Sequence, residues 1–99
     1  MAEYAPIKSG SSALTSVGDS ATSVTILAAN AQRKGASIRN TSTAILYLRM
    51  DGGTATTTTG NSVSLDGGDY FEVPFGYTGL ITGIWASDAG GAANVTEYI

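Results

Sequence analysis

Two acidic residues that flank a pair of glycines are the side chains in this sequence best spaced to do chemistry together. Asp66 and Asp69 enclose Gly67-Gly68, so their carboxylates could converge on a cation or on a sugar. Asp and Gly also build hairpin turns, because glycine adopts positive φ without strain. We favour the turn, here and at Asp51-Gly52-Gly53, since a calcium loop would need more oxygen ligands at regular spacing.

The residue types that most enzymes use for catalysis are missing. The sequence has no histidine and no cysteine, which excludes Ser-His-Asp and Cys-His arrangements, disulfides and the usual zinc sites. Its two lysines, Lys8 and Lys34, have no serine at the spacing that suggests a Ser-Lys pair. We therefore expect no catalytic residue, no cofactor and no metal, and we interpret the chain as non-enzymatic.

Aromatic residues gather in one stretch of sixteen residues, at Tyr70, Phe71, Phe75, Tyr77 and Trp85. Such a density is typical of a carbohydrate-stacking surface, of a protein interface or of a hydrophobic core. We favour the core for Phe71 and Trp85. Tyr77 stands between glycines, and we expect it at a rim, where it could contact a partner.

Charged residues are few and unevenly distributed. They make up 13% of the chain, against roughly 25% in an average soluble domain. Residues 1–50 carry all five basic residues and a net charge of +3, whereas residues 51–99 carry −6. The two halves either pair across strands of one sheet or face partners of opposite charge. With a net charge of −3, nucleic-acid binding is not expected.

Short alternating segments between turn residues predict an all-β fold. Thr, Ser and Gly dominate, and no segment shows the period of a helix. The expected strands lie at 22–28, 36–39, 44–50, 62–65, 70–73, 80–86 and 92–98. The strand at 44–50 is apolar on both faces for part of its length, so we place it centrally. This pattern predicts a small antiparallel β-sandwich or a jelly-roll-like barrel.

The first 21 residues lack a clear alternation, and we assign them to an N-terminal arm ahead of a β-sandwich domain at 22–99. The arm is either a partly ordered tail or a segment that orders against a partner. In the second case, deleting residues 1–20 would remove binding and leave the fold intact. The threonine-rich segment 54–60 has no apolar face and is expected to be a loop or an exposed edge.

A chain of 99 residues forms one domain with a modest core, and it has no disulfide to reinforce it. Association with further copies is the remaining common source of stability, so we expect a homo-oligomer. Residues 1–10 contain Glu3 and Lys8 and no apolar run, so a signal peptide is not expected. No apolar stretch has the length of a membrane span, and we expect synthesis in the cytoplasm.

Across residues 33–99 the order of motifs resembles that of small virion structural proteins of tailed bacteriophages. The series comprises Arg39-Asn40, Ser42 and Leu46-Tyr47-Leu48, then LDGGDYFEVP at 65–74, FGYTGLITGIWA at 75–86 and GAANVTE at 91–97. Asp66 departs from the proline expected in that hairpin, which affects only the expected turn type. The resemblance covers none of the N-terminal third.

This resemblance implies a virion protein without catalytic residues. Its most specific form is a head decoration protein, often a trimer, that binds the major capsid protein; a neck, collar or tail-fibre-attachment protein is the alternative. On that interpretation the residues expected to contact the capsid or another partner are Lys8, Arg33, Lys34, Arg39 and Tyr77. A third hypothesis is a small carbohydrate-binding module that uses Tyr70, Tyr77 and the Asp66/Asp69 turn.

Overall fold

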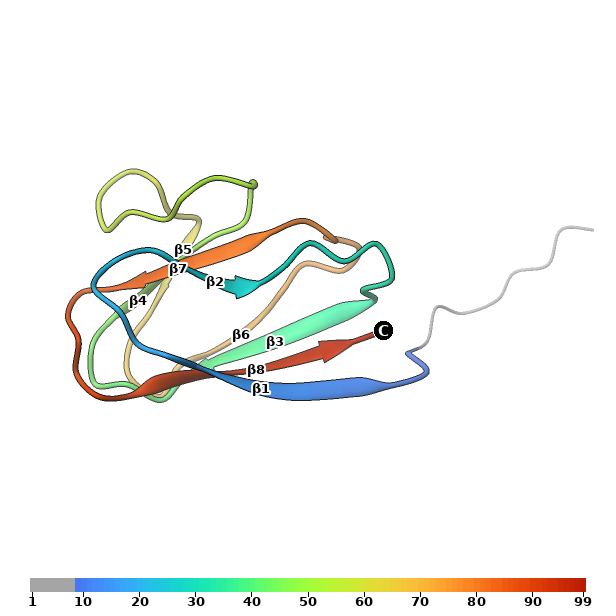
Figure 1. The fold of residues 1–99 in the computed structure, drawn as a ribbon, viewed down its shortest axis with the longest axis horizontal. Helices are drawn as coiled ribbons and strands as arrows, with labels where there is room; N and C mark the ends of the chain where they lie inside the picture. Colours follow the sequence, from blue (N-terminus) through green and yellow to red (C-terminus); the bar gives the residue numbers. More distant parts are fainter. Residues whose placement is uncertain (1–8) are drawn as a thin grey trace, which may run out of the picture.

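A computed structural model describes residues 9–99, and within this range the chain is entirely strand, turn and loop. Figure 1 shows two layers of antiparallel strands facing each other. The eight strands are β1 (Ser12–Gly18), β2 (Val24–Leu27), β3 (Gly35–Asn40), β4 (Leu46–Arg49), β5 (Val63–Leu65), β6 (Tyr70–Glu72), β7 (Ile81–Trp85) and β8 (Ala92–Tyr98).

The strands form two four-stranded sheets. Sheet A has the order β1-β8-β3-β6 and sheet B the order β2-β7-β4-β5. The predicted small β-sandwich is confirmed, and each of the seven strands expected from the sequence has its counterpart in β2 to β8. β4 lies between β7 and β5, as its two apolar faces predicted. The threonine-rich segment 54–60 contains no strand.

Strand β1 corrects the expected N-terminal arm. Residues 12–18 pair with β8 along their full length, from Ser12 opposite Tyr98 to Gly18 opposite Ala92. Apolar alternation does not mark this strand, because its side chains are exposed on both faces apart from the half-buried Val17. Farther on, the carbonyl of Ser20 accepts a hydrogen bond from Trp85 N at 2.9 Å. Deleting residues 1–20 would therefore remove part of the sandwich. Residues 1–8 lie outside the described residues.

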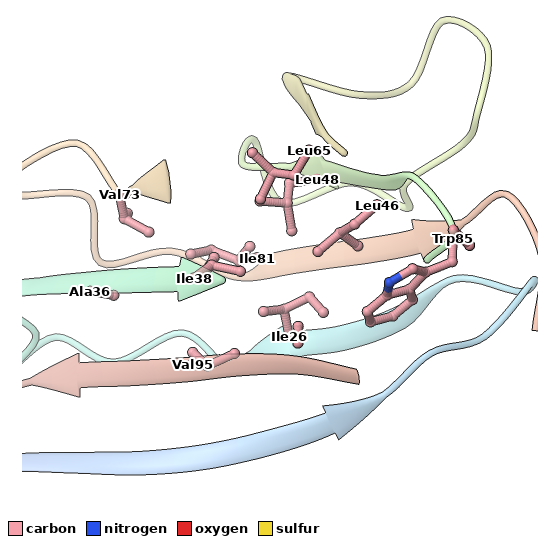
Figure 2. Close-up of a cluster of buried hydrophobic side chains, with 12 residues drawn as sticks. Ile26, Ala36, Ile38, Leu46, Leu48, Leu65, Val73, Ile81, Trp85 and Val95 are labelled. Atoms are coloured by element: carbon pink, nitrogen blue, oxygen red, sulfur yellow. The ribbon is translucent and has the colours of Figure 1, made fainter. Parts of the chain in front are cut away.

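The hydrophobic core fills the space between the two sheets (Figure 2). Trp85, Ile38, Leu46, Leu48 and Ile81 are each 0% exposed. The prediction of Trp85 as core is thus confirmed, and Phe71 is half-buried against the same cluster. Close packing of this kind makes the relative position of the sheets sensitive to every buried group.

A single buried amide, that of Asn40, joins the two sheets. Its Nδ2 donates to the carbonyls of Ala44 (2.8 Å) and Leu65 (3.0 Å). Its Oδ1 accepts from Ser42 N and from Trp85 Nε1, both at 3.1 Å. Asn40 is 0% exposed, and these bonds use its whole side-chain hydrogen-bonding capacity. The amide thus fixes the 41–45 turn and satisfies the indole nitrogen inside the core.

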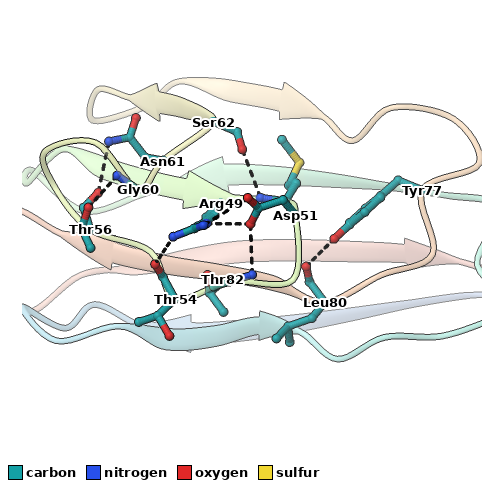
Figure 3. A network of polar contacts seen from close by, with 12 residues as sticks. Arg49, Asp51, Thr54, Thr56, Gly60, Asn61, Ser62, Tyr77, Leu80 and Thr82 are labelled. Atoms are coloured by element: carbon teal, nitrogen blue, oxygen red, sulfur yellow. Dashed lines mark hydrogen bonds and ion pairs between the residues drawn. The ribbon is translucent and has the colours of Figure 1, made fainter.

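The loop at 50–62 folds over the outer face of sheet B (Figure 3). The Arg49 guanidinium binds both carboxylate oxygens of Asp51 and the carbonyl of Thr54. The hydroxyl of Thr82 on β7 donates to the Gly53 carbonyl at 2.7 Å, and Ala55 is 2% exposed. Part of sheet B is therefore covered by its own chain.

Replacing Asn40 should be among the most destabilising single changes in the protein. Asn40→Ala leaves the indole N–H and two carbonyls without partners in the core, so we expect a loss of at least about 3 kcal/mol in the free energy of unfolding. Asn94→Ala, on the exposed face of sheet A, should change it by less than about 0.5 kcal/mol. Urea denaturation of both variants measures the difference; equal effects would contradict the role assigned to Asn40.

Candidate binding surface

The outer face of sheet A is open, and the register places its side chains in rows. Directly paired residues of antiparallel strands lie on the same face. One row runs Leu14, Thr96, Ser37 and Glu72, and the next runs Ser16, Asn94, Arg39 and Tyr70. Most of these side chains are exposed.

A shallow groove of about 400 Å³ lies at the β3–β6 side of this face. Three aromatic side chains line it, and all are exposed: Tyr70 (60%), Phe75 (68%) and Tyr98 (40%). Lys34 and Glu72 add one charge of each sign to its lining. Exposed aromatic rings beside a few polar groups are typical of surfaces that bind a protein segment or a sugar.

Lys34 and Arg39 lie where a partner could reach them. Lys34 is half-buried and lines the groove, and its Nζ is 3.5 Å from the carbonyl of Gln32. Arg39 is exposed and stands directly opposite Tyr70 in the β3–β6 pair. The structure therefore brings two of the expected contact residues to the face that carries the groove. Lys8 lies outside the described residues.

Arg33 was expected to contact the capsid or another partner, but the structure buries it. Its guanidinium is fully buried and forms a 2.8 Å ion pair with Glu97. It also donates to the carbonyls of Ala28 (2.5 Å), Tyr77 (3.3 Å) and Gly79 (2.9 Å). The side chain ties the 28–33 loop and the 74–80 turn to β8, so it stabilises the fold instead of contacting a partner.

Tyr77 lies outside the groove. Its hydroxyl donates to the carbonyl of Leu80 at 2.7 Å (Figure 3), and its half-buried ring packs against the core. Its hydrogen-bonding group is thus used within its own turn. Tyr77 therefore offers a partner neither its hydroxyl nor a place in the groove.

Neither Phe75 nor Tyr98 was among the contact residues named from the sequence, although Phe75 belongs to the aromatic stretch. Phe75 follows Pro74 in a glycine-containing turn, a position from which a side chain rarely reaches a core. Tyr98 is three residues beyond the buried Val95, and alternation along a strand places it on the opposite, outer face. The alternation in β8 was therefore the signal that could have identified Tyr98.

The acidic turns are structural. Asp69 Oδ2 accepts from Asp66 N at 2.9 Å, Asp69 N donates to the Asp66 carbonyl at 3.0 Å, and Gly68 has φ of 89°. Asp51 likewise accepts from Gly53 N at 3.0 Å as well as from Arg49. Both regions are turns, as favoured above. Among residues 9–99, no three acidic side chains gather closely enough to hold a metal ion.

Asp19 anchors three segments at one end of the sandwich. Its Oδ2 accepts from Ser42 Oγ (2.7 Å), Gly91 N (2.8 Å) and Ala89 N (3.2 Å). The hydrogen bond from Ser42 is the main cause that lowers the pKa of Asp19, and the backbone N–H groups act in the same direction. The pKa of Asp51 is also lowered, chiefly by the hydrogen bond from Arg49.

Comparisons with protein-family models, with curated proteins and with solved structures found no match for this chain. In the part of the chain that the structure describes, no helix has the length and apolar character needed to cross a membrane.

Substitution of the adjacent basic residues Arg33 and Lys34 should affect stability to very different extents. Arg33→Lys leaves several carbonyls and Glu97 without the planar set of donors, so we expect a loss of about 2–4 kcal/mol in the free energy of unfolding. Lys34→Ala should change it by less than about 0.5 kcal/mol. Chemical denaturation measures both; a well-tolerated Arg33→Lys would contradict the buried role.

Acid should weaken the end of the sandwich that Asp19 holds. A folded-state pKa below the unfolded value of about 3.9 contributes stability above that pH, which is lost as the pH falls through the folded pKa. We expect the urea midpoint of the native protein to fall below about pH 4. Asp19→Asn should have a lower midpoint at pH 7 and a smaller further decrease in acid. Parallel pH profiles for the two proteins would exclude this contribution.

Proposed function

We propose that this protein is a non-enzymatic binding module that attaches to a larger protein assembly through the groove on sheet A. The observation that carries this proposal is the cluster of Tyr70, Phe75 and Tyr98, exposed together beside the open face of one sheet. Three large aromatic rings exposed to water add no stability to an isolated domain, and exposed apolar patches mark interaction sites. Burying them against a partner supplies binding energy, and aromatic side chains are enriched among the residues that dominate interfaces.

The charge pattern supports a protein partner. Lys34 and Glu72 both line the groove, so it presents both signs within a small area, and Arg39 lies on the same face of sheet A as Glu72. Such a mixture orients an extended protein segment, whereas a polyanion would be repelled by the acidic side chain. The overall charge of −3 agrees with this preference.

We further propose that the assembly is a bacteriophage virion and that the protein decorates its head, with the major capsid protein as partner. Support for this step is the ordered resemblance over residues 33–99. In the structure those motifs contain Asn40, whose buried amide joins the two sheets, together with the 66–69 turn, β7 and β8. A decoration protein that binds only the mature lattice stabilises it by mass action. A neck, collar or tail-fibre-attachment role uses the same surface at another position on the particle.

If the protein binds a carbohydrate, the structure indicates a different set of contact residues from the set expected from the sequence. The Asp69 carboxylate and the Tyr77 hydroxyl are engaged within their own turns, and neither Asp66 nor Asp69 lines the groove. Tyr70, Phe75 and Tyr98 remain as a stacking surface, with Glu72 as a polar neighbour. A glycan array therefore belongs in the test as the outcome that would replace the capsid proposal.

Groove variants should lose binding without losing stability. Tyr70→Ala and Phe75→Ala each remove an exposed ring, so we expect roughly tenfold weaker binding or more and unchanged thermal unfolding. The measurement is co-sedimentation with heads assembled from the capsid protein of the same genome. Ile45→Ala is the matched control and should bind normally, because Ile45 is an exposed apolar residue directly before β4, in the other sheet.

Three outcomes decide between the proposals. Saturable binding that only the groove variants weaken supports the capsid interface. Native protein that does not sediment with heads contradicts head decoration. Saturable glycan binding that Tyr70→Ala abolishes would favour the carbohydrate-binding module.

A further inference from the structure

Strand β1 forms one long edge of sheet A, and no other strand among residues 9–99 pairs with its outer side. Among residues 9–99 its only hydrogen-bonded neighbour is β8, since the sheet order is β1-β8-β3-β6 (Figure 1). β1 has seven residues, whereas the other edge strands, β2, β5 and β6, have four, three and three. An unpaired edge of this length is a template for another strand.

The register shows which backbone groups point outward. Ser11 and Ile99 exchange two hydrogen bonds, and Asp19 N donates to Gly91, so these two pairs flank β1. Hydrogen-bonded pairs alternate along an antiparallel ladder. The odd-numbered residues of β1 therefore bond to β8. Ser12, Leu14, Ser16 and Gly18 direct their N–H and C=O groups away from the sheet.

Nothing in β1 protects this edge. Proteins usually block long edges with a charge, a proline or a bulge. Residues 9–18 contain neither a charged residue nor a proline, and the β1–β8 register is regular from end to end. By contrast, β2 on sheet B carries a register shift between Thr25 and Leu27. Leu14 is 70% exposed on β1, which adds an apolar side chain to the open edge.

We propose that β1 pairs with β1 of a second copy of this chain, antiparallel and about a two-fold axis at Thr15. This register opposes Ser12 to Gly18 of the second copy and Leu14 to Ser16. All four outward-facing residues are then paired, which gives eight hydrogen bonds and one continuous eight-stranded sheet.

The segment is complementary to itself, which is why a second copy is the occupant. No charge meets a like charge across the axis, because residues 9–18 carry none. Thr15 faces Thr15 of the second copy, a favourable cross-strand pair, and Ala13 faces Val17. A pairing of identical strands closes as a two-fold dimer, which differs from the trimer that the resemblance implies. This inference goes beyond the proposed function and does not depend on it, because the groove lies at the β3–β6 side of the sheet.

Cysteine cross-linking tests both the pairing and its register. The chain contains no cysteine, so Thr15→Cys introduces a single thiol at the axis. A directly opposed, non-hydrogen-bonded pair has Cα atoms about 4.5 Å apart, within the range of a disulfide. Mild oxidation should convert Thr15→Cys to a covalent dimer. Ala13→Cys, four residues from its copy along the strand, should stay largely uncross-linked.

Light scattering tests the native association. We expect a mass of twice the 10.0 kDa chain. Leu14→Lys places charge beside the axis and should weaken the dimer at least about tenfold while leaving thermal unfolding unchanged. Leu14→Glu mixed with Leu14→Lys should restore association. Thr25→Lys, on the edge of sheet B, is the control and should dimerise normally.

A native mass of one chain or of three chains would overturn the proposal. Equal cross-linking of Thr15→Cys and Ala13→Cys would exclude the Thr15 register. Neither result would affect binding through the groove, which is measured with heads and with variants on the other side of the sheet.

Discussion

The hydrogen bonds of one buried amide set the geometry on which the rest of this sandwich depends. Asn40 ends β3 in sheet A, yet its side chain satisfies Trp85 and the carbonyl of Leu65, both in sheet B. A buried indole N–H without a partner would cost free energy comparable to a lost hydrogen bond, so Trp85 can fill the core only while the amide is present. Packing alone favours burial but tolerates small sliding of the sheets, whereas this directional network fixes one arrangement.

Two polar anchors extend that constraint to the ends of the sandwich. Asp19 binds Ser42 and the 89–91 segment at one end, and Arg33 binds Glu97 and the 77–79 carbonyls at the other. Gly91 passes so close to Ser42 that a Cβ there would clash with its backbone. The loops of this small domain are thus held by charged groups turned inward.

The sequence predicted what local alternation controls and missed what the tertiary fold decides. β2 to β8 follow from the alternating apolar positions, and Trp85 follows from its place in the strongest of these strands. β1 has no buried face, so its residues carry no such pattern, and only its ladder with β8 defines it. Arg33 and Lys34 are adjacent basic residues that local sequence does not distinguish, and they differ in role because the fold buries only Arg33. The groove required the pairing of β3 with β6, which no single segment encodes.

The two sheets differ in what they leave exposed, and this difference connects the fold to function. Sheet B is covered in part by the 50–62 loop, and its edge strands are short or interrupted by a register shift. Sheet A keeps an open face, an aromatic groove on one side and an uncharged edge on the other. A cover over both sheets would bury more surface and so add stability to a small domain with a modest core. Among residues 9–99 no loop covers sheet A in this way, and this difference supports the proposal that partners complete sheet A.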